Sequence, residues 1–205
     1  MGSASGQLVR SRLTRSELPV DTAALARFLI GKVVVRETPE GVISGRIVET
    51  EAYVLGDAAS HAFRGLTPRT RPMFLERGHA YIYLNYGTSW MLNVSSEAEG
   101  IGAGVLVRAL EPLEGIALMQ AHRGTEKLRD LARGPGRLCK ALQIGPWAKG
   151  LDLCQEGPLW LAHGNGEPGD VGQGVRIGIT KDADRPLRFY VRGSPFVSGT
   201  RALNV

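Results

Sequence analysis

Residues 32–53 read KVVVRETPEGVISGRIVETEAY, and this stretch decides the fold class. The β-branched run Lys32–Glu37 predicts a strand, and Pro39-Glu40-Gly41 has the composition of a turn. Val42–Tyr53 then predicts the returning strand of a hairpin. The core of the domain is therefore expected to contain an antiparallel sheet built outward from this hairpin.

Weaker patterns extend the sheet in both directions. They predict a helix over 21–31, strands at 79–86, 90–94 and 105–110, helices over 113–122 and 138–142, and strands near 175–179 and 187–191. Glu111-Pro112-Leu113 predicts a helix start with proline in the first turn. Strands followed by helices and strands again favour a single α+β domain with a mostly antiparallel sheet and surrounding helices. Residues 54–72 predict a long irregular loop, which in a compact domain is often functional.

Length and composition set the domain count and exclude several protein classes. The 205 residues suit one domain, with a flexible N-terminal tail expected over 1–18 and the folded domain over 19–205. A hydrophobic fraction of 43% excludes a fully disordered chain. No apolar run approaches membrane-spanning length, and no secretory signal is expected. Two cysteines are too few for a disulfide framework or a zinc ribbon.

Basic residues are unevenly distributed. The net charge of +5 is concentrated in residues 61–80, 120–149 and 176–201, which are rich in arginine and lysine. Such segments suit a polyanionic partner, but a solvated basic surface would have the same composition. Charge alone therefore leaves a nucleic-acid partner as one of two interpretations.

The second strand of the central hairpin carries an unusual group of polar residues. On a period of two, Ile47, Glu49, Glu51 and Tyr53 share one face. Asp57 and His61 follow in the long loop. Three interpretations stay open: Glu51 is a general base for water, the four acidic and histidine side chains bind a metal, or all are surface charges.

The aromatic run at residues 81–87, YIYLNYG, is the second unusual feature. Alternation places Tyr81 and Tyr83 on one face of a strand, and Tyr86 falls at its end beside Gly87. Without further context, the simplest interpretation of the whole run is a hydrophobic strand with ordinary tyrosines. A large aromatic at a hairpin tip is instead suited to stacking on a nucleobase or wedging between bases.

Together these stretches resemble the alkyladenine (3-methyladenine) DNA glycosylase family. The matching segments occur in the family's order over about residues 20–198: 45–53, 60–62 with 64–65, 67–74, 81–83 with 86–87, 93–94, 105–115, 134–142 and 186–195. Thr88-Ser89-Trp90-Met91-Leu92 departs from the family, which often has histidine and cysteine there. The departure bears on lesion preference and on contacts of the hairpin.

The resemblance implies a role for each matching residue. Glu51 matches the general base, Arg108 matches the arginine that helps to hold the attacking water, and Ile177 matches the residue whose backbone carbonyl does the same. The implied base pocket contains Tyr53, His61, Tyr83 and Asn93. Tyr86 matches the aromatic that enters the minor groove from a protruding hairpin on a curved sheet. Arg64, Arg69 and Arg71 are expected to contact DNA phosphates.

The implied activity is a monofunctional glycosylase that flips alkylated or deaminated purines out of duplex DNA. A water activated by Glu51 would hydrolyse the N-glycosidic bond and leave an abasic site, without metal, cofactor or AP lyase activity. The partner would be double-stranded DNA containing damaged purines, with no membrane, and the protein would act as a monomer. The expected location is the bacterial cytoplasm, near the nucleoid, or a eukaryotic nucleus.

Two other functions remain as alternatives. A metal-dependent nuclease would use Glu49, Glu51, Asp57 and His61 as ligands and would lose activity in chelator. A nucleic-acid-binding module without catalysis would bind DNA in a salt-dependent manner and release no base.

Overall fold

The hairpin over residues 32–53 forms as predicted and lies at the centre of the sheet. β1 (Val33–Thr38) and β2 (Gly41–Tyr53) pair antiparallel across a tight turn. Valine and isoleucine favour this extended backbone because their branched side chains pack well on a pleated surface. The computed structural model describes residues 11–200 together with 203 and 204.

The remaining elements of the described residues are short. The strands are β3 (Ala80–Asn85), β4 (Ser89–Ser95), β5 (Gly104–Glu114), β6 (Leu159–Ala162), β7 (Val171–Gly174) and β8 (Arg188–Val191). The helices are α1 (Thr22–Leu29), α2 (Ile116–Arg123) and α3 (Pro135–Ala141). Five 3₁₀ turns lie at Arg15–Glu17, His61–Arg64, Arg71–Phe74, Leu128–Asp130 and Pro146–Ala148.

All strands belong to one antiparallel sheet that curls around β2. The main order is β3-β4-β5-β2-β1-β6, and β7 joins through β8. One edge of β2 pairs with β5, while its other edge pairs first with β1 and then, over Glu49–Glu51, with β8. The predicted α+β fold with a curved, mostly antiparallel sheet is therefore confirmed.

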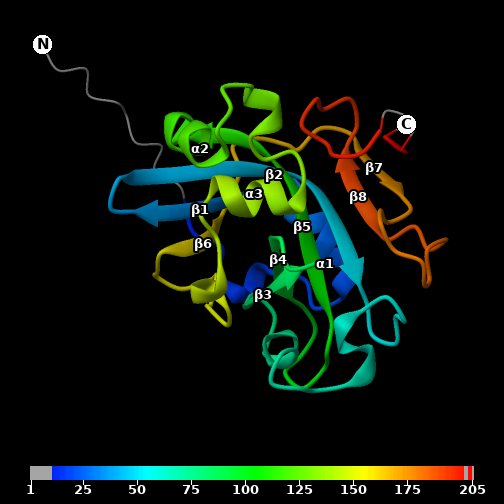
Figure 1. Cartoon of the computed structure of the whole chain (residues 1–205). Helices are drawn as coiled ribbons and strands as arrows, with labels where there is room; N and C mark the ends of the chain where they lie inside the picture. The colour runs from blue at the N-terminus through cyan, green and yellow to red at the C-terminus, as the bar shows by residue number, and fades with distance from the viewer. Residues whose placement is uncertain (1–10, 201–202, 205) are drawn as a thin grey trace, which may run out of the picture.

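Helices cover the curled sheet on more than one side. In Figure 1, α1 lies behind β2 and β5, whereas α3 lies in front of β2. The hydroxyl of Thr50 on β2 donates to the carbonyl of Ala26 in α1 at 2.8 Å. The main hydrophobic core lies around this contact and includes Leu25, Leu29 and Val107. No helix in the described part of the chain is long and apolar enough to span a membrane.

The helix start predicted at Glu111-Pro112-Leu113 is wrong, because these residues continue β5. Pro112 pairs with Gly45 across the sheet, and α2 begins only after Gly115. Gly115 has a φ of +66°, and a Cβ there would lie 2.5 Å from the carbonyl oxygen of Val42. The change from strand to helix therefore depends on a glycine, and the proline is incidental to it.

Two further predictions at the ends of the chain differ from the structure. The strand expected near 175–179 lies instead at β7, and residues 175–179 are irregular. The first ten residues of the predicted tail lie outside the described residues. Residues 11–18 pack on the domain: Leu13 and Leu18 are buried, and the Leu13 amide donates to the carbonyl of Leu161.

Candidate active site

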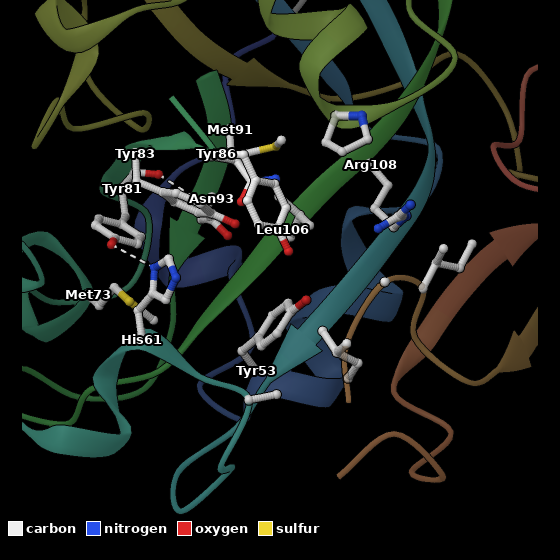
Figure 2. A pocket seen from close by; sticks show the side chains of 16 residues that line it. Tyr53, His61, Met73, Tyr81, Tyr83, Tyr86, Met91, Asn93, Leu106 and Arg108 are labelled. Atoms are coloured by element: carbon white, nitrogen blue, oxygen red, sulfur yellow. Dashed lines mark hydrogen bonds between the residues drawn. The ribbon is translucent and has the colours of Figure 1, made fainter. Parts of the chain in front are cut away.

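A cavity of about 190 Å³ opens beside the hairpin formed by β3 and β4. Figure 2 shows aromatic side chains around it, with His61 and Arg108 on opposite sides. Its lining comes from β2, the loop after β2, the hairpin, β5 and the irregular segment 177–179. The sequence predicted seven of these lining residues: Tyr53, His61, Tyr83, Tyr86, Asn93, Arg108 and Ile177.

Two bulges in the β2–β5 pairing aim the polar side chains at this cavity. Ile47 pairs with Leu110 and Glu49 with Ala109, which leaves Val48 outside the register. Thr50 then pairs with Val107, which leaves Arg108 outside it on the other strand. Bulges are common next to active sites because they redirect side chains.

The bulge at Val48 also corrects the predicted face of β2. We expected Ile47 to share a face with Glu49, Glu51 and Tyr53. Instead Ile47 belongs to the main core with Ala52, while Val48 packs on Ala109 in a separate cluster. The extra residue shifts the alternation by one, because the period of two breaks at a bulge.

Glu51 lies fully buried behind the cavity with its carboxylate satisfied by three donors. Arg108 Nη1 lies 3.1 Å from Oε1, and the Ile177 amide donates to the same oxygen at 2.7 Å. The Tyr53 hydroxyl donates to Oε2 at 3.0 Å. A buried carboxylate is tolerated only with such partners.

Arg108 connects Glu51 to a second buried carboxylate. Its Nε lies 3.2 Å from Glu49 Oε1. Burial alone would lower the pKa of Arg108, but the charges of Glu51 and Glu49 outweigh burial and raise it. The guanidinium therefore stays charged and holds the position of the Glu51 carboxylate.

Glu49 has a different environment from Glu51. Its carboxylate accepts from Arg188 Nε at 2.6 Å and from the Ser198 amide at 2.8 Å, in addition to Arg108. It does not line the cavity. These contacts fasten β2 to β8 and to the C-terminal segment, so Glu49 is a structural residue.

The aromatic side of the cavity is formed by Tyr53, His61, Tyr81 and Tyr83. The rings of Tyr81 and Tyr83 stack with centroids 5.5 Å apart, as their alternation predicted, and His61 lies edge-on to Tyr83 at 4.4 Å. His61 Nδ1 and the Tyr81 hydroxyl are 2.9 Å apart (Figure 2). The sequence did not single out Tyr81 as a site residue, because its spacing also fits ordinary core packing.

Burial keeps these ring groups uncharged. It raises the pKa of Tyr83 to about 12, and together with the charge of Glu51 it raises the pKa of Tyr53. Burial, followed by the charge of Arg69, lowers the pKa of His61. A neutral imidazole therefore faces the cavity at neutral pH.

Asn93 and Met91 come from β4 on the floor of the cavity. The Asn93 amide donates to the carbonyl of Tyr81 at 3.1 Å, which fixes its position in the hairpin. Met91 and Leu106 supply apolar surface beside it. Met91 belongs to the stretch where the sequence departs from the family pattern.

Tyr86 occupies the tip of the β3–β4 hairpin. Its side chain is 90% exposed, and its φ is +47°. Gly87 follows with a φ of +69°, and the Thr88 amide donates to the carbonyl of Asn85. Two successive positive φ angles are typical of a type I′ hairpin turn, which usually prefers asparagine and glycine. An exposed tyrosine in this strained position is not explained by packing.

The segment that carries Ile177 is anchored by its neighbour Arg176. Arg176 pairs with Asp57, and both side chains are fully buried. The guanidinium also donates to the carbonyl of Ala52 at 3.0 Å and lies 4.7 Å from the Tyr53 ring centroid. The sequence left Asp57 without a firm role; the structure places it in this anchor.

The three arginines expected at DNA phosphates lie in exposed positions of the long loop. Arg69 lies 5.8 Å from the Tyr83 ring centroid, so it borders the cavity. Arg64 ends the first 3₁₀ turn of the loop and Arg71 begins the second. The loop is irregular as predicted, apart from these two turns.

The four residues of the nuclease hypothesis do not converge. Arginines separate Glu49, Glu51 and Asp57, while His61 contacts Tyr81. Among the described residues, no group of three or more acidic, histidine or cysteine side chains is arranged to hold a metal ion. The geometry therefore disfavours that hypothesis.

Comparisons with known proteins identify relatives over nearly the whole chain. The family model described as methylpurine-DNA glycosylase matches residues 16–195. A protein of Mesorhizobium japonicum is 71% identical over 191 residues, covering 93% of this chain and 92% of its own. Proteins of Paraburkholderia phytofirmans and Methanoculleus marisnigri are 56% and 47% identical, covering 94% and 87% of this chain and 91% and 94% of their own. All three carry the name "Putative 3-methyladenine DNA glycosylase".

Proposed function

The chain belongs to the methylpurine-DNA glycosylase family, whose activity is on methylated purines in DNA, and we propose that it works by base flipping with Glu51 as general base. The observation that carries this proposal is the position of Glu51. Its carboxylate lies behind an aromatic cavity and is held by Arg108, Tyr53 and the Ile177 amide.

Base flipping is needed because a stacked base cannot reach a pocket, and unstacking costs a few kcal/mol. Tyr86 offsets part of this cost by filling the space that the nucleotide leaves. Its exposure and its place at a hairpin tip beside the cavity support this role. Arg64, Arg69 and Arg71 contact phosphates around the flipped nucleotide.

The pocket selects alkylated purines by charge and by fit. An alkylated purine is cationic, and a cation over an aromatic face gains about 0.5–2 kcal/mol. Tyr53 and Tyr83 supply such faces, and neutral His61 adds no opposing charge. Asn93 crowds the exocyclic amine of normal guanine, whereas hypoxanthine, a deaminated purine, carries no amine at that position.

Hydrolysis begins when the glycosidic bond lengthens and positive charge develops on the sugar. Glu51 stabilises this charge and accepts a proton from the attacking water. Arg108 holds the Glu51 carboxylate in place and orients the water, and the backbone carbonyl of Ile177 accepts a hydrogen bond from that water. The products are a free base and an abasic site.

The enzyme is proposed to be monofunctional. A lyase reaction through a Schiff base needs an amine nucleophile at the site. The described residues that line the cavity include no lysine. Water is therefore the nucleophile in this scheme, and the DNA backbone stays intact.

The test is a single-turnover assay in chelator on end-labelled duplexes with one hypoxanthine, one ethenoadenine or methylation damage. We expect breaks only after alkali, and a loss of at least about 100-fold in Glu51→Gln. Glu111→Gln, whose residue pairs with Arg46 on the outer part of the sheet, is the matched control and should retain activity. Breaks without alkali would show a lyase or nuclease, and unchanged excision by Glu51→Gln would remove Glu51 as the base.

A further inference from the structure

A second hollow adjoins the base cavity along β4 of the β3–β4 hairpin. It is an open groove of about 770 Å³ between the hairpin, the end of α2, α3 and residues 143–147. The two hollows share Met91 and Pro135 in their linings. Tyr86 borders the cavity, whereas Thr88 and Ser89 border the groove. Trp90 lines the groove but not the cavity, and by the alternation of β4 it faces away from Met91 and Asn93, so the groove extends to the other flank of the hairpin.

The lining of the groove is cationic. Arg123, Arg137 and Lys140 contribute to it, and none of the described lining residues is acidic. Arg137 pairs with Asp130 at 3.1 Å, but both side chains are well exposed. An exposed pair of this kind contributes little, so the arginine can exchange its partner for a phosphate.

Five of the seven basic residues at 120–149 form two groups in the structure. Arg123, Arg129 and Arg133 donate to backbone carbonyls and hold the fold together. Arg137 and Lys140 are both exposed and lie on α3, where the groove is. The second group is available for an external anion.

Two tryptophans give the groove a flat apolar wall. Trp90 and Trp147 both approach Gly145: a Cβ there would lie 3.8 Å and 3.7 Å from atoms of their rings. Trp147 is 42% exposed, and its indole donates to the carbonyl of Gln143 at 3.0 Å, which fixes the ring. Aromatic surface next to cations suits the sugar and phosphate of a nucleic-acid strand.

We propose that this groove binds the backbone of the strand opposite the lesion. The inference rests on the proposed function, in which Tyr86 enters the minor groove. A wedge in that groove has one strand on each side. The cavity takes a nucleotide from one strand, so the groove on the other flank of the hairpin faces the complementary strand. Lys140 and Arg137 bind its phosphates.

The test measures equilibrium binding to lesion duplexes that carry a single neutral methylphosphonate at successive positions of either strand. For the wild type, neutralising one or two complementary-strand phosphates near the lesion should weaken binding severalfold. The same replacement should have no further effect in Lys140→Ala or Arg137→Ala. In each variant, the slope of log binding constant against log salt concentration should also become shallower by about 1, because one phosphate contact is lost.

Arg27→Ala is the matched control, because Arg27 is exposed in the last turn of α1, behind the sheet (Figure 1). It should bind like the wild type. The inference would be overturned if the losses of binding caused by the substitution and by the methylphosphonate simply add. It would also be overturned if the two losses are non-additive only for phosphates of the lesion strand. Excision measured on the same duplexes separates the two proposals. If the protein shows the expected coupling in binding but releases no base, the groove proposal stands and the glycosylase mechanism is refuted.

Discussion

At the scale of single residues, Tyr86 offers a test that separates stability from function. Its φ of +47° is costly for a tyrosine and natural for a glycine. We expect Tyr86→Gly to raise the free energy of unfolding by about 1 kcal/mol, because the strain disappears. Excision from duplex DNA should fall about tenfold or more, because stacking is lost. Thermal unfolding and single-turnover excision measure the two effects.

For stability alone, the comparison is Asp182→Gly, which removes another positive φ (+47°) in a turn whose carbonyl accepts from Arg176. It also removes the Asp182 carboxylate that accepts from the Ala58 amide, so any gain in stability should be smaller. A Tyr86→Gly variant that excises bases as fast as the wild type would show that the tip does not enter the duplex.

If His61 lies beside the flipped base as proposed, we expect the choice between lesions to depend on pH. Its lowered pKa keeps it neutral down to a pH below the ordinary value of about 6.5. Below that folded-state pKa it becomes a cation beside the base and repels a cationic purine. The ratio of 7-methylguanine to hypoxanthine excision should therefore fall as the pH drops.

The ratio of rates removes any pH effect that both substrates share, such as protonation of the general base. In His61→Gln, the fall in this ratio should disappear, since glutamine does not titrate. A ratio that falls equally in the variant would assign the pH dependence to another group.

At the scale of residues, the sequence predicted which residue types form the site. It did not predict which way each side chain points or which distant residue it pairs with. The family resemblance assigned Glu51, Arg108 and Tyr53 to one site, and all three are in contact. The face of Ile47 was wrong because a bulge has no marker in the sequence. Arg176 was missed for a related reason: its partner Asp57 is distant in sequence, and nothing local indicates the pairing.

At the scale of elements, the junction between β5 and α2 depends on Gly115. Gly115→Ala combines a positive φ with a Cβ 2.5 Å from the Val42 carbonyl oxygen. Gly124, at the other end of α2, has the same φ of +66°, but a Cβ there would have no neighbouring atom within 4 Å. An alanine at Gly124 therefore measures the cost of the positive φ alone, whereas an alanine at Gly115 adds the steric overlap.

We expect Gly124→Ala to cost about 1 kcal/mol of unfolding free energy, because only the φ is unfavourable. Gly115→Ala should cost clearly more, because backbone must also move. The measurement is chemical denaturation of both variants. The two unfolding free energies can be compared if they depend on denaturant concentration with the same slope. Equal losses would mean that the β5–α2 junction relaxes freely around a Cβ.

The same junction explains why strands were predicted better than their ends. The β-branched and aromatic runs of β1–β4 are bounded by turn residues, and the positions of these strands were right to within a few residues. Pro112 was misleading because proline also tolerates a strand where its missing amide is not needed. The strand expected at 175–179 failed because Val175, Ile177 and Ile179 alternate for another reason: Ile177 and Ile179 line the cavity.

At the scale of the whole molecule, arginines bind the C-terminal segment across the back of the site. Arg133 donates to the carbonyls of Val197 and Gly199 at 2.8 and 3.0 Å, and Arg129 to that of Pro195. The Ser198 amide in turn donates to Glu49, which shares Arg108 with Glu51. The segment is therefore connected to Glu51, the proposed general base, through two buried side chains, Glu49 and Arg108.

This connection predicts that Arg133, which does not line the cavity, affects excision through the C-terminal segment. Arg133→Ala should cost about 2 kcal/mol of unfolding free energy, because two carbonyls lose a charged donor. Hydrogen exchange should rise over residues 194–200, and the single-turnover excision rate should fall while DNA binding changes little. Arg192→Ala removes only an exposed pair with Asp170 and should change none of these quantities. If Arg133→Ala frees the segment and the excision rate stays at the wild-type value, then Glu49 and Arg108 hold Glu51 in place without help from the C-terminal segment.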